Sequence, residues 1–220
     1  RDSATDTPTN NFCTLNPLIM HHTSTGALVT AQGNCHLNEA THVTALGTMG
    51  STTMKFYYEY KLNSSAADVS MGVMGSNFPQ ATSGHAYNDP GAYGFYGETS
   101  SQYKITAGSW ASDSTFSEDG IYHFAIDPVG NKLWVGKDGT WDGDPAAGTG
   151  NIVTLGTHEY LPWIHISGSA GDNSASCNFG GCSSFTVSSG NADADGYGNF
   201  EFAVPSGFYA LCTKNLAEYG

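Results

Sequence analysis

Apolar and polar residues alternate along short stretches of the chain, which is the pattern of half-buried β-strands. The clearest stretch is 55–62 (KFYYEYKL), and the stretches 121–127 and 132–137 form a predicted hairpin across a Pro-Val-Gly-Asn turn. Alternate residues of these stretches share one face, so we expect the following in or near the core: Phe56, Tyr58, Tyr60, Tyr122, Phe124, Ile126, Leu133 and Val135.

The other predicted strands are short and are separated by turns rich in Gly, Pro, Asn and Asp. No segment keeps helical spacing over ten residues, and 180–203 reads as a mostly polar loop. This pattern favours an all-β fold, a two-sheet antiparallel β-sandwich, and 220 residues suit one such domain. We therefore predict a single domain over 1–220, in which the N-terminal arm 1–20 packs near the C-terminal strand 207–214.

The charge of the chain excludes some classes of partner. Only 12% of the residues are charged, and the net charge is −13 with 7 Lys and Arg. Proteins that bind phosphate backbones take most of their affinity from basic side chains, so we expect no nucleic-acid partner. No apolar run approaches the roughly 20 residues that span a bilayer, so we expect no membrane insertion.

Five cysteines leave at least one without a partner in the chain. Two disulfides are candidates: Cys177 with Cys182 would close a small loop, and Cys13 with Cys212 would join the two ends of a sandwich. The alternative is that all five are small buried hydrophobic residues. A zinc site is not expected, because the chain has no Cys-x-x-Cys pair.

One acidic loop has oxygen ligands at alternate positions followed by glycine, as in loops that wrap calcium. No cofactor is required by any other motif, so calcium is the only candidate. The acid falls one place early for a bidentate ligand at position twelve, and the alternative is a solvent-exposed acidic loop. The candidate ligands are Asn191, Asp193, Asp195, Asn199 and Glu201.

Aromatic residues in or beside the loops are candidates for ligand binding, because exposed rings stack on sugars and anchor protein interfaces. We expect the loops 76–91 and 138–151 to carry the site, with Asp142 and Asp144 as acceptors beside Trp141. For the strand residues Trp134 and Trp163, we expect a core position instead. The other candidate ligand-binding residues are Tyr87, Tyr93 and Trp110.

No catalytic pattern stands out. A glycosidase needs two carboxylates that face each other across the sugar, and no Glu-x-Asp-x-Glu triplet is present on a strand. No Gly-x-Ser-x-Gly elbow accompanies the eight scattered histidines. We therefore predict no catalytic residues and no enzyme activity.

Several strands resemble those of SPRY domains, which are concanavalin-like jelly-roll sandwiches. The segment 55–60 (KFYYEY) is similar to their Lys-Trp-Tyr-Trp-Glu strand. The stretch 119–139 resembles their central hairpin, 160–164 (YLPWI) their Tyr-Phe-Pro-Ala-Val strand and 177–180 (CNFG) their Val-Asn-Phe-Gly strand. The ends, 6–17 and 205–216, resemble the openings and closings of SPRY-like modules in bacteriophage tail and other virion proteins.

This resemblance covers nearly the whole chain, apart from the loops 76–91 and 138–158. It implies a non-enzymatic structural or adhesion module of a virion, located at the particle surface and multimeric in the assembly. Its expected partners are other virion proteins or a glycan or protein of the host surface. Two alternatives are a free carbohydrate-binding lectin and a divergent glycosidase on the same fold.

Overall fold

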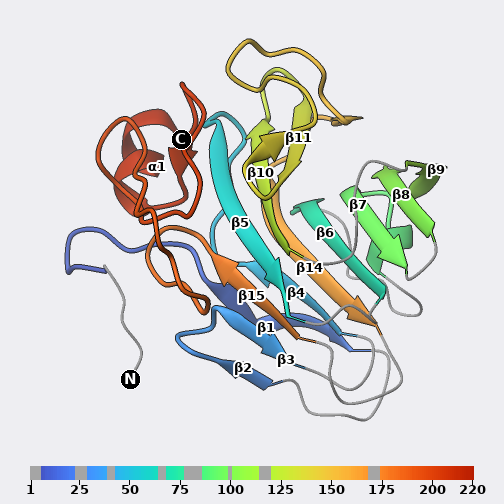
Figure 1. The fold of residues 1–220 in the computed structure, drawn as a ribbon, viewed down its shortest axis with the longest axis horizontal. Helices are drawn as coiled ribbons and strands as arrows, with labels where there is room; N and C mark the ends of the chain where they lie inside the picture. Colours follow the sequence, from blue (N-terminus) through green and yellow to red (C-terminus); the bar gives the residue numbers. More distant parts are fainter. Residues whose placement is uncertain are drawn as a thin grey trace.

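The computed structural model is a sandwich of two sheets whose strands run antiparallel, with one exception in the second sheet (Figure 1). No described helix is long and apolar enough to cross a membrane. The structure describes residues 6–22, 29–38, 43–63, 68–76, 86–98, 101–113, 120–167 and 174–220.

The first sheet has seven strands, and β9 forms one of its edges. The single-turn 3-10 helix η1 (Ala86–Asn88) precedes β7. In spatial order the strands are β1 (Leu15–His22), β4 (Val43–Gly47), β14 (Tyr160–Ser167), β6 (Asp68–Gly75), β7 (Ala92–Glu98), β8 (Ser101–Thr106) and β9 (Ser109–Ser112).

The second sheet is centred on β5 and β10. On its main path lie β12 (Thr140–Trp141), β11 (Lys132–Lys137), β10 (Gly120–Asp127), β5 (Phe56–Leu62), β15 (Ser174–Asn178), β3 (His36–Asn38) and β2 (Val29–Ala31). Two short strands join it from the side: β13 (Val153–Thr154) pairs with β11, and β16 (Tyr209–Ala210) pairs with β5 in parallel. The helix α1 (Thr213–Tyr219) follows β16.

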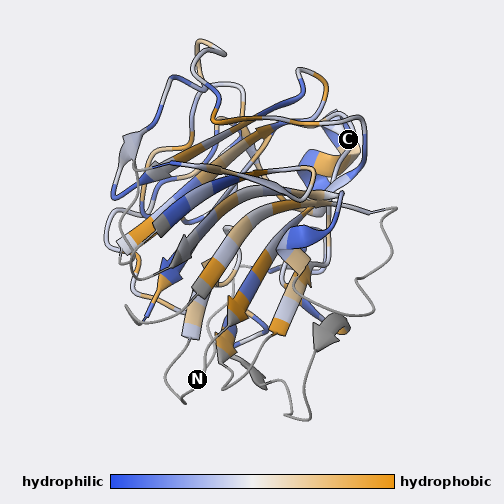
Figure 2. Ribbon diagram, turned by 90° about the vertical axis from the view of Figure 1, so that its right-hand side faces the viewer, coloured by the Kyte–Doolittle hydropathy of each residue, from blue (hydrophilic) through white to orange (hydrophobic). Residues whose placement is uncertain are grey.

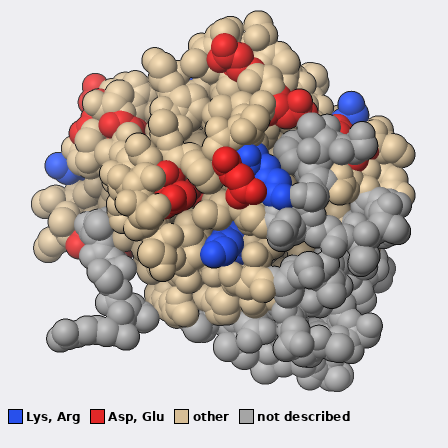
Figure 3. All heavy atoms as spheres, in the orientation of Figure 1, with Lys and Arg blue, Asp and Glu red and all other residues tan. Residues whose placement is uncertain are grey.

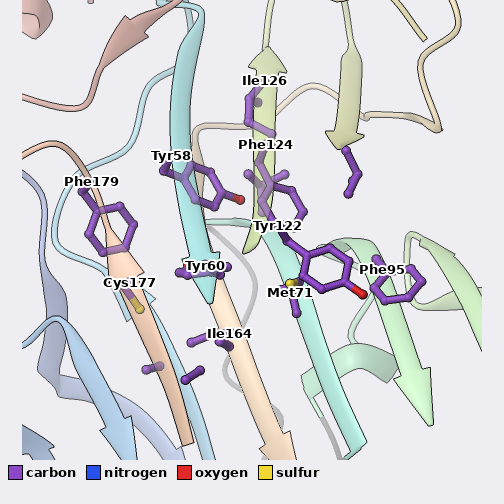
Figure 4. Close-up of a cluster of buried hydrophobic side chains, with 14 of the residues drawn as sticks. Tyr58, Tyr60, Met71, Phe95, Tyr122, Phe124, Ile126, Ile164, Cys177 and Phe179 are labelled. Carbon is purple, nitrogen blue, oxygen red and sulfur yellow. The ribbon is translucent and has the colours of Figure 1, made fainter. Parts of the chain in front are cut away.

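The main core lies between the two sheets and contains all eight residues expected there, each with no exposed surface. The register explains this result, because β5 and β10 place Tyr58 opposite Phe124. These two rings stack at 5.1 Å between centroids (Figure 4). Tyr58 also donates its hydroxyl proton to the backbone oxygen of Gly72 in the first sheet, so one side chain bonds the two layers.

Close approach of β6 and β7 requires glycine at two facing positions. Gly72 lies opposite Gly94, with φ of +152° and +151°. A Cβ atom on Gly72 would lie 2.1 Å from the backbone oxygen of Tyr93, which is closer than atoms can approach. At these two positions, β6 and β7 therefore carry no side chain of their own on the outer face of the first sheet.

The outer face of the second sheet is covered by the C-terminal part of the chain. Residues 180–203 contain no strand, as expected of a loop, but their role as a cover was not predicted. Apolar residues recur along the strands (Figure 2), and some face outward into a second cluster. The buried members of this cluster are Phe12, Tyr57, Ala125, Trp134, Phe200, Phe208, Ala210 and Cys212.

The N-terminal arm lies against the C-terminal segment. Phe12 is bridged to Cys212, the amide of Cys13 donates to the oxygen of Leu211 at 2.8 Å, and Thr213 donates to Asn11 at 2.9 Å. The two segments expected near each other are therefore hydrogen-bonded through their backbones.

The two predicted disulfides are not present, since all five cysteines are buried free thiols. Cys13 points into the main core, whereas Cys212 points into the outer cluster. The reason is that Cys212 is bridged to the residue before Cys13, and neighbouring residues of an extended segment face opposite ways. Cys177 likewise faces the main core, while the thiol of Cys182 donates to the backbone oxygen of Gln32 at 3.2 Å. The pairing of Cys13 with Cys212 fails because the two side chains lie on opposite faces of the bridge, and that of Cys177 with Cys182 fails because the Cys182 thiol bonds the turn before β3 instead.

Candidate binding surface

Four aromatic side chains gather on the outer face of the first sheet, and we call this group the aromatic surface. The register places Tyr96 opposite Tyr103 and Ile105 opposite Trp110, so the strands β7, β8 and β9 present these residues on one face. Tyr87 reaches the same place from η1. The aromatic surface consists of Tyr87, Tyr96, Tyr103 and Trp110.

Trp110 lies in contact with all three tyrosines. Its ring centroid is 4.9 Å from Tyr87, 4.9 Å from Tyr96 and 5.6 Å from Tyr103. Nevertheless 39% of Trp110 is exposed, and every residue of β9 is exposed as well. The tyrosines therefore pack against one side of the indole, while its other side is exposed to solvent, as in an aromatic residue that anchors a ligand.

The base of the aromatic surface is fixed by buried contacts. The Tyr87 ring packs edge-on against His165 at 5.1 Å, and His165 is hydrogen-bonded to the hydroxyl of Thr44 at 2.8 Å. Tyr87 and Tyr96 are 5% and 2% exposed. Because these side chains are packed, the surface is already formed without a ligand, which lowers the entropy lost on binding.

The structure divides the six predicted ligand-binding residues into separate groups. Tyr87 and Trp110 meet in the aromatic surface, but Tyr93 is buried in the main core, where it packs on Tyr160 at 5.7 Å. Tyr93 and Tyr96 are three positions apart on one strand, so their side chains lie on opposite faces of the sheet. Tyr93 therefore faces the core and not the solvent. The alternation of 92–96 and 102–105 could have identified the two residues that were missed, Tyr96 and Tyr103.

Trp141 lies on the other sheet and is only partly exposed. Its ring packs at 4.3 Å from His123 and 6.2 Å from Tyr57, so it covers the outer cluster. Asp144 accepts a hydrogen bond from the amide of Ala147 at 2.9 Å, which is a turn contact, and Asp142 is half-buried. The loop 138–151 is thus folded onto its sheet, while residues 77–85 of the loop 76–91 lie outside the described residues.

The strand tryptophans Trp134 and Trp163 have no exposed surface, as expected of core residues, but they lie in clusters on the outer faces of the two sheets and not between the sheets. The indole nitrogen of Trp134 donates to the backbone oxygen of Thr149 at 2.8 Å and so holds the loop 138–151 in place. That of Trp163 donates to the oxygen of Tyr93 at 3.3 Å.

Asp193, the central residue of the candidate calcium loop, is buried and accepts four hydrogen bonds. Its Oδ1 accepts from the amides of Asp195 at 3.0 Å and Tyr197 at 2.9 Å. Its Oδ2 accepts from the amide of Ala210 at 2.9 Å and from the side chain of Asn215 at 2.8 Å. This carboxylate therefore ties the acidic loop to β16 and α1.

The other candidate calcium ligands also contact protein groups. Glu201 accepts two hydrogen bonds from Ser188 at 2.6 Å, and these bonds lower the pKa of its exposed carboxyl. Asn191 donates to the oxygen of Glu201 at 2.9 Å, and Asp195 accepts from the hydroxyl of Tyr219 at 2.9 Å. Asn199 is exposed. Within the described part of the chain, no three His, Cys, Asp or Glu side chains form a group that could hold a metal.

Calcium at this loop stays a prediction, and melting with and without EDTA tests it. An ion that binds only the folded protein raises its melting temperature, so EDTA should lower the melting temperature of calcium-loaded protein. Asp195→Asn should remove that shift, and it leaves the buried contacts of Asp193 in place. Equal melting with and without EDTA would contradict the ion and leave Asp193 with its hydrogen-bonding role.

Glu59 is a second buried carboxylate, on the outer face of β5. It accepts hydrogen bonds from the Tyr57 hydroxyl at 2.8 Å, the Asn178 side chain at 3.0 Å, and the amides of Glu201 at 3.0 Å and Phe202 at 2.9 Å. Burial raises the pKa of the Glu59 carboxyl, and these hydrogen bonds lower it in part. Glu59 and Asp193 together attach the C-terminal cover to the second sheet.

His123 is buried directly opposite Glu59 in the register of β10 and β5. Neither ring nitrogen has a hydrogen-bond partner among the described residues, and the ring lies between Trp141 at 4.3 Å and Phe202 at 5.0 Å. Burial lowers the pKa of His123 to about 3, so the imidazole is neutral at physiological pH.

No family model and no curated protein matches the sequence. Solved structures do match the fold. The PSpry domain of TRIM65 superposes with a TM-score of 0.56 at 10% identity over 76% of this chain and 89% of that domain. The SPRY domain of human HERC1 gives a TM-score of 0.54 at 12% identity over 78% of this chain and 99% of that domain.

The chain has a SPRY-type fold. A third similar structure is stonustoxin, with a TM-score of 0.53 at 13% identity over 76% of this chain and 27% of the toxin chain. Identities of 10–13% relate these SPRY-type sandwiches by architecture alone. The sequence resemblance to SPRY domains is confirmed at the level of the fold.

Proposed function

We propose that this chain is a non-enzymatic structural or adhesion module of a virion, and that it attaches to another virion protein or to a host surface through the aromatic surface. The observation that carries the proposal is the exposure of Trp110, which is 39% accessible while it packs on three tyrosines. SPRY-type sandwiches commonly mediate protein binding, so a partner protein is the first ligand class.

The exposed edge of the first sheet adds to this argument. A partner that covers Trp110 would also meet β9, whose side chains are small apart from the tryptophan: Ser109, Ala111 and Ser112. Charged side chains are few, and acidic and basic ones are intermixed on the face shown in Figure 3. The four side chains of the aromatic surface carry no charge, so this surface would gain its affinity from apolar burial around one anchor rather than from ion pairs.

The buried carboxylates support a role without catalysis. Each one in the described part of the chain has a structural contact: Asp127 accepts from the amide of Gly130 at 2.7 Å, and Asp89 accepts from Gly91 at 2.9 Å. Glu59 and Asp193 are occupied as described above. A glycosidase would instead hold two carboxyl groups toward one sugar.

A single module of this kind would bind weakly, and many copies on one particle would raise the effective concentration of the site. The test is therefore made with multimerised protein, on a panel of intact bacterial cells and on a glycan array. We expect Trp110→Ala to reduce cell binding at least tenfold, because truncation of an aromatic anchor typically costs more than about 1.4 kcal/mol. Melting curves check that the variant is folded.

Val129→Ser is the matched control, because Val129 is 67% exposed in the β10–β11 turn of the other sheet. It should bind as the unmodified protein does. Loss of binding after protease treatment of the cells would indicate a protein partner, and binding to the array would indicate a glycan. Equal binding by Trp110→Ala would contradict the site, and no binding to any cell or glycan would contradict attachment to a host surface.

A further inference from the structure

Two cysteines that are far apart in the sequence meet at one tight turn. The turn at residues 32–35 leads into β3, and the backbone oxygen of Gln32 accepts from the amide of Cys35 at 3.3 Å. The same oxygen accepts from the thiol of Cys182 at 3.2 Å. The thiol of Cys35 donates to the backbone oxygen of Gly33 at 3.8 Å, so both thiols bond backbone oxygens of the same turn and lie side by side.

The backbone on both sides of this contact is fixed. The amide of Cys177 donates to the oxygen of Cys35 at 2.6 Å, and the hydroxyl of Ser184 donates to the same oxygen. Gly33, at φ +67°, leaves room for the second thiol, because a Cβ atom there would lie 3.2 Å from the Sγ of Cys182. The pair is therefore held by both flanking segments.

The surroundings favour reaction between these two thiols over the others. Cys182 is 7% exposed, whereas the other four cysteines have no exposed surface, so an oxidant reaches Cys182 first and Cys35 only through it. Cys177 is a neighbour of the pair, but its side chain points into the main core. The interaction with Cys182, followed by burial, raises the pKa of Cys35, so the Cys35 thiol stays protonated near neutral pH and is the less reactive member of the pair.

We propose that Cys35 and Cys182 form a reversible disulfide when the protein meets a disulfide oxidant. The thiolate of Cys182 attacks the oxidant and forms a mixed disulfide, releasing one thiol of the oxidant. The thiolate of Cys35 then attacks the Cys182 sulfur, forms the Cys35–Cys182 bond and releases the second thiol. Two cysteine thiols lose two protons and two electrons, and one disulfide is reduced to two thiols.

This bond would join the turn before β3 to the segment that follows β15, where the C-terminal cover begins. The link closes a loop of more than a hundred residues, and long loops restrict the unfolded chain most. The oxidised protein should therefore melt about 5–10 °C above the reduced protein.

The experiment treats the folded 220-residue protein with oxidised glutathione at pH 8 and compares it with the same protein in dithiothreitol. We expect the intact mass to fall by about 2 Da for one disulfide, with no glutathione retained. Chymotrypsin then locates the bond, because cleavage after Phe179 separates Cys177 from Cys182, and cleavage after Leu15 separates Cys13 from Cys35. The linked peptide should contain Cys35 and Cys182.

Cys35→Ser and Cys182→Ser should abolish the mass change and the rise in melting temperature, whereas Cys13→Ser and Cys212→Ser should keep both. The comparison of the oxidised with the reduced unmodified protein tests the proposal even if one of the serine variants does not fold. A linked peptide that contains Cys177 would overturn the assignment, and so would full alkylation of all five thiols after oxidation and denaturation.

Discussion

Replacing Glu59 with alanine is expected to lower the free energy of unfolding by about 3–5 kcal/mol. Four donors converge on this carboxylate, and all four lose their acceptor in the variant: the Tyr57 hydroxyl, the Asn178 amide, and the backbone amides of Glu201 and Phe202. Because the site is buried, water replaces the lost acceptor only if the C-terminal cover moves away from β5.

Urea unfolding followed by tyrosine and tryptophan fluorescence measures this loss. Glu201→Ala is the matched control, because that carboxylate is at the surface and contacts only Ser188 and its neighbour; it should cost less than about 1 kcal/mol. The loss of unfolding free energy in Glu59→Gln should lie between those of the two alanine variants, because glutamine keeps the shape of the side chain but turns an NH₂ group toward donors. Equal stability of the two alanine variants would show that Glu59 does not attach the cover.

Acid should destabilise the protein through His123. Its folded pKa is about 3, while the pKa of an exposed histidine in the unfolded chain is about 6.5. Between these values the unfolded chain binds a proton that the folded protein does not. The stability is therefore complete above pH 6.5 and falls on the order of 4 kcal/mol as the pH drops toward 3.

His123→Leu should remove this part of the pH dependence, because leucine fills the site between Trp141 and Phe202 without a titrating group. Glu59, which faces His123 across the strands, acts in the opposite sense: its raised pKa makes stability fall as the pH rises above about 4.5. Unfolding free energy is measured against pH for the unmodified protein and for His123→Leu. The difference between these two profiles is the contribution of the histidine. Parallel profiles from pH 7 to pH 3 would contradict a buried neutral imidazole.

The inward face of the central strands could be predicted from sequence, because alternation there coincides with burial between two sheets. The outward face could not. Alternation assigns Glu59, Tyr57 and His123 to the solvent side of their strands, yet all three are buried. The cover that buries them is a segment without periodicity, and only its distant contacts with β5 order it.

The binding surface was predicted in part for a similar reason. Tyr87 and Trp110 were identified as aromatics near loops, and they do meet, but the pairing of β7, β8 and β9 that joins them to Tyr96 and Tyr103 is a matter of sheet register. Cysteine pairing follows the same rule. Spacing along the chain suggested Cys177 with Cys182, whereas the contact that forms is with Cys35, 147 positions away.

The attachment of the C-terminal cover has a consequence for synthesis of the chain on the ribosome. Strand β5 ends at Leu62, but its neighbours β10, β15 and β16 and three of the four groups that donate to Glu59 lie between residues 120 and 210. The central strand therefore emerges long before its partners, and its carboxylate stays hydrated until residue 202 has left the exit tunnel. Contacts so distant in sequence slow folding and leave partly paired strands exposed. A chain cut short after residue 179 would keep most of its strands and lack the segment that covers them, and it should accumulate as an aggregation-prone intermediate.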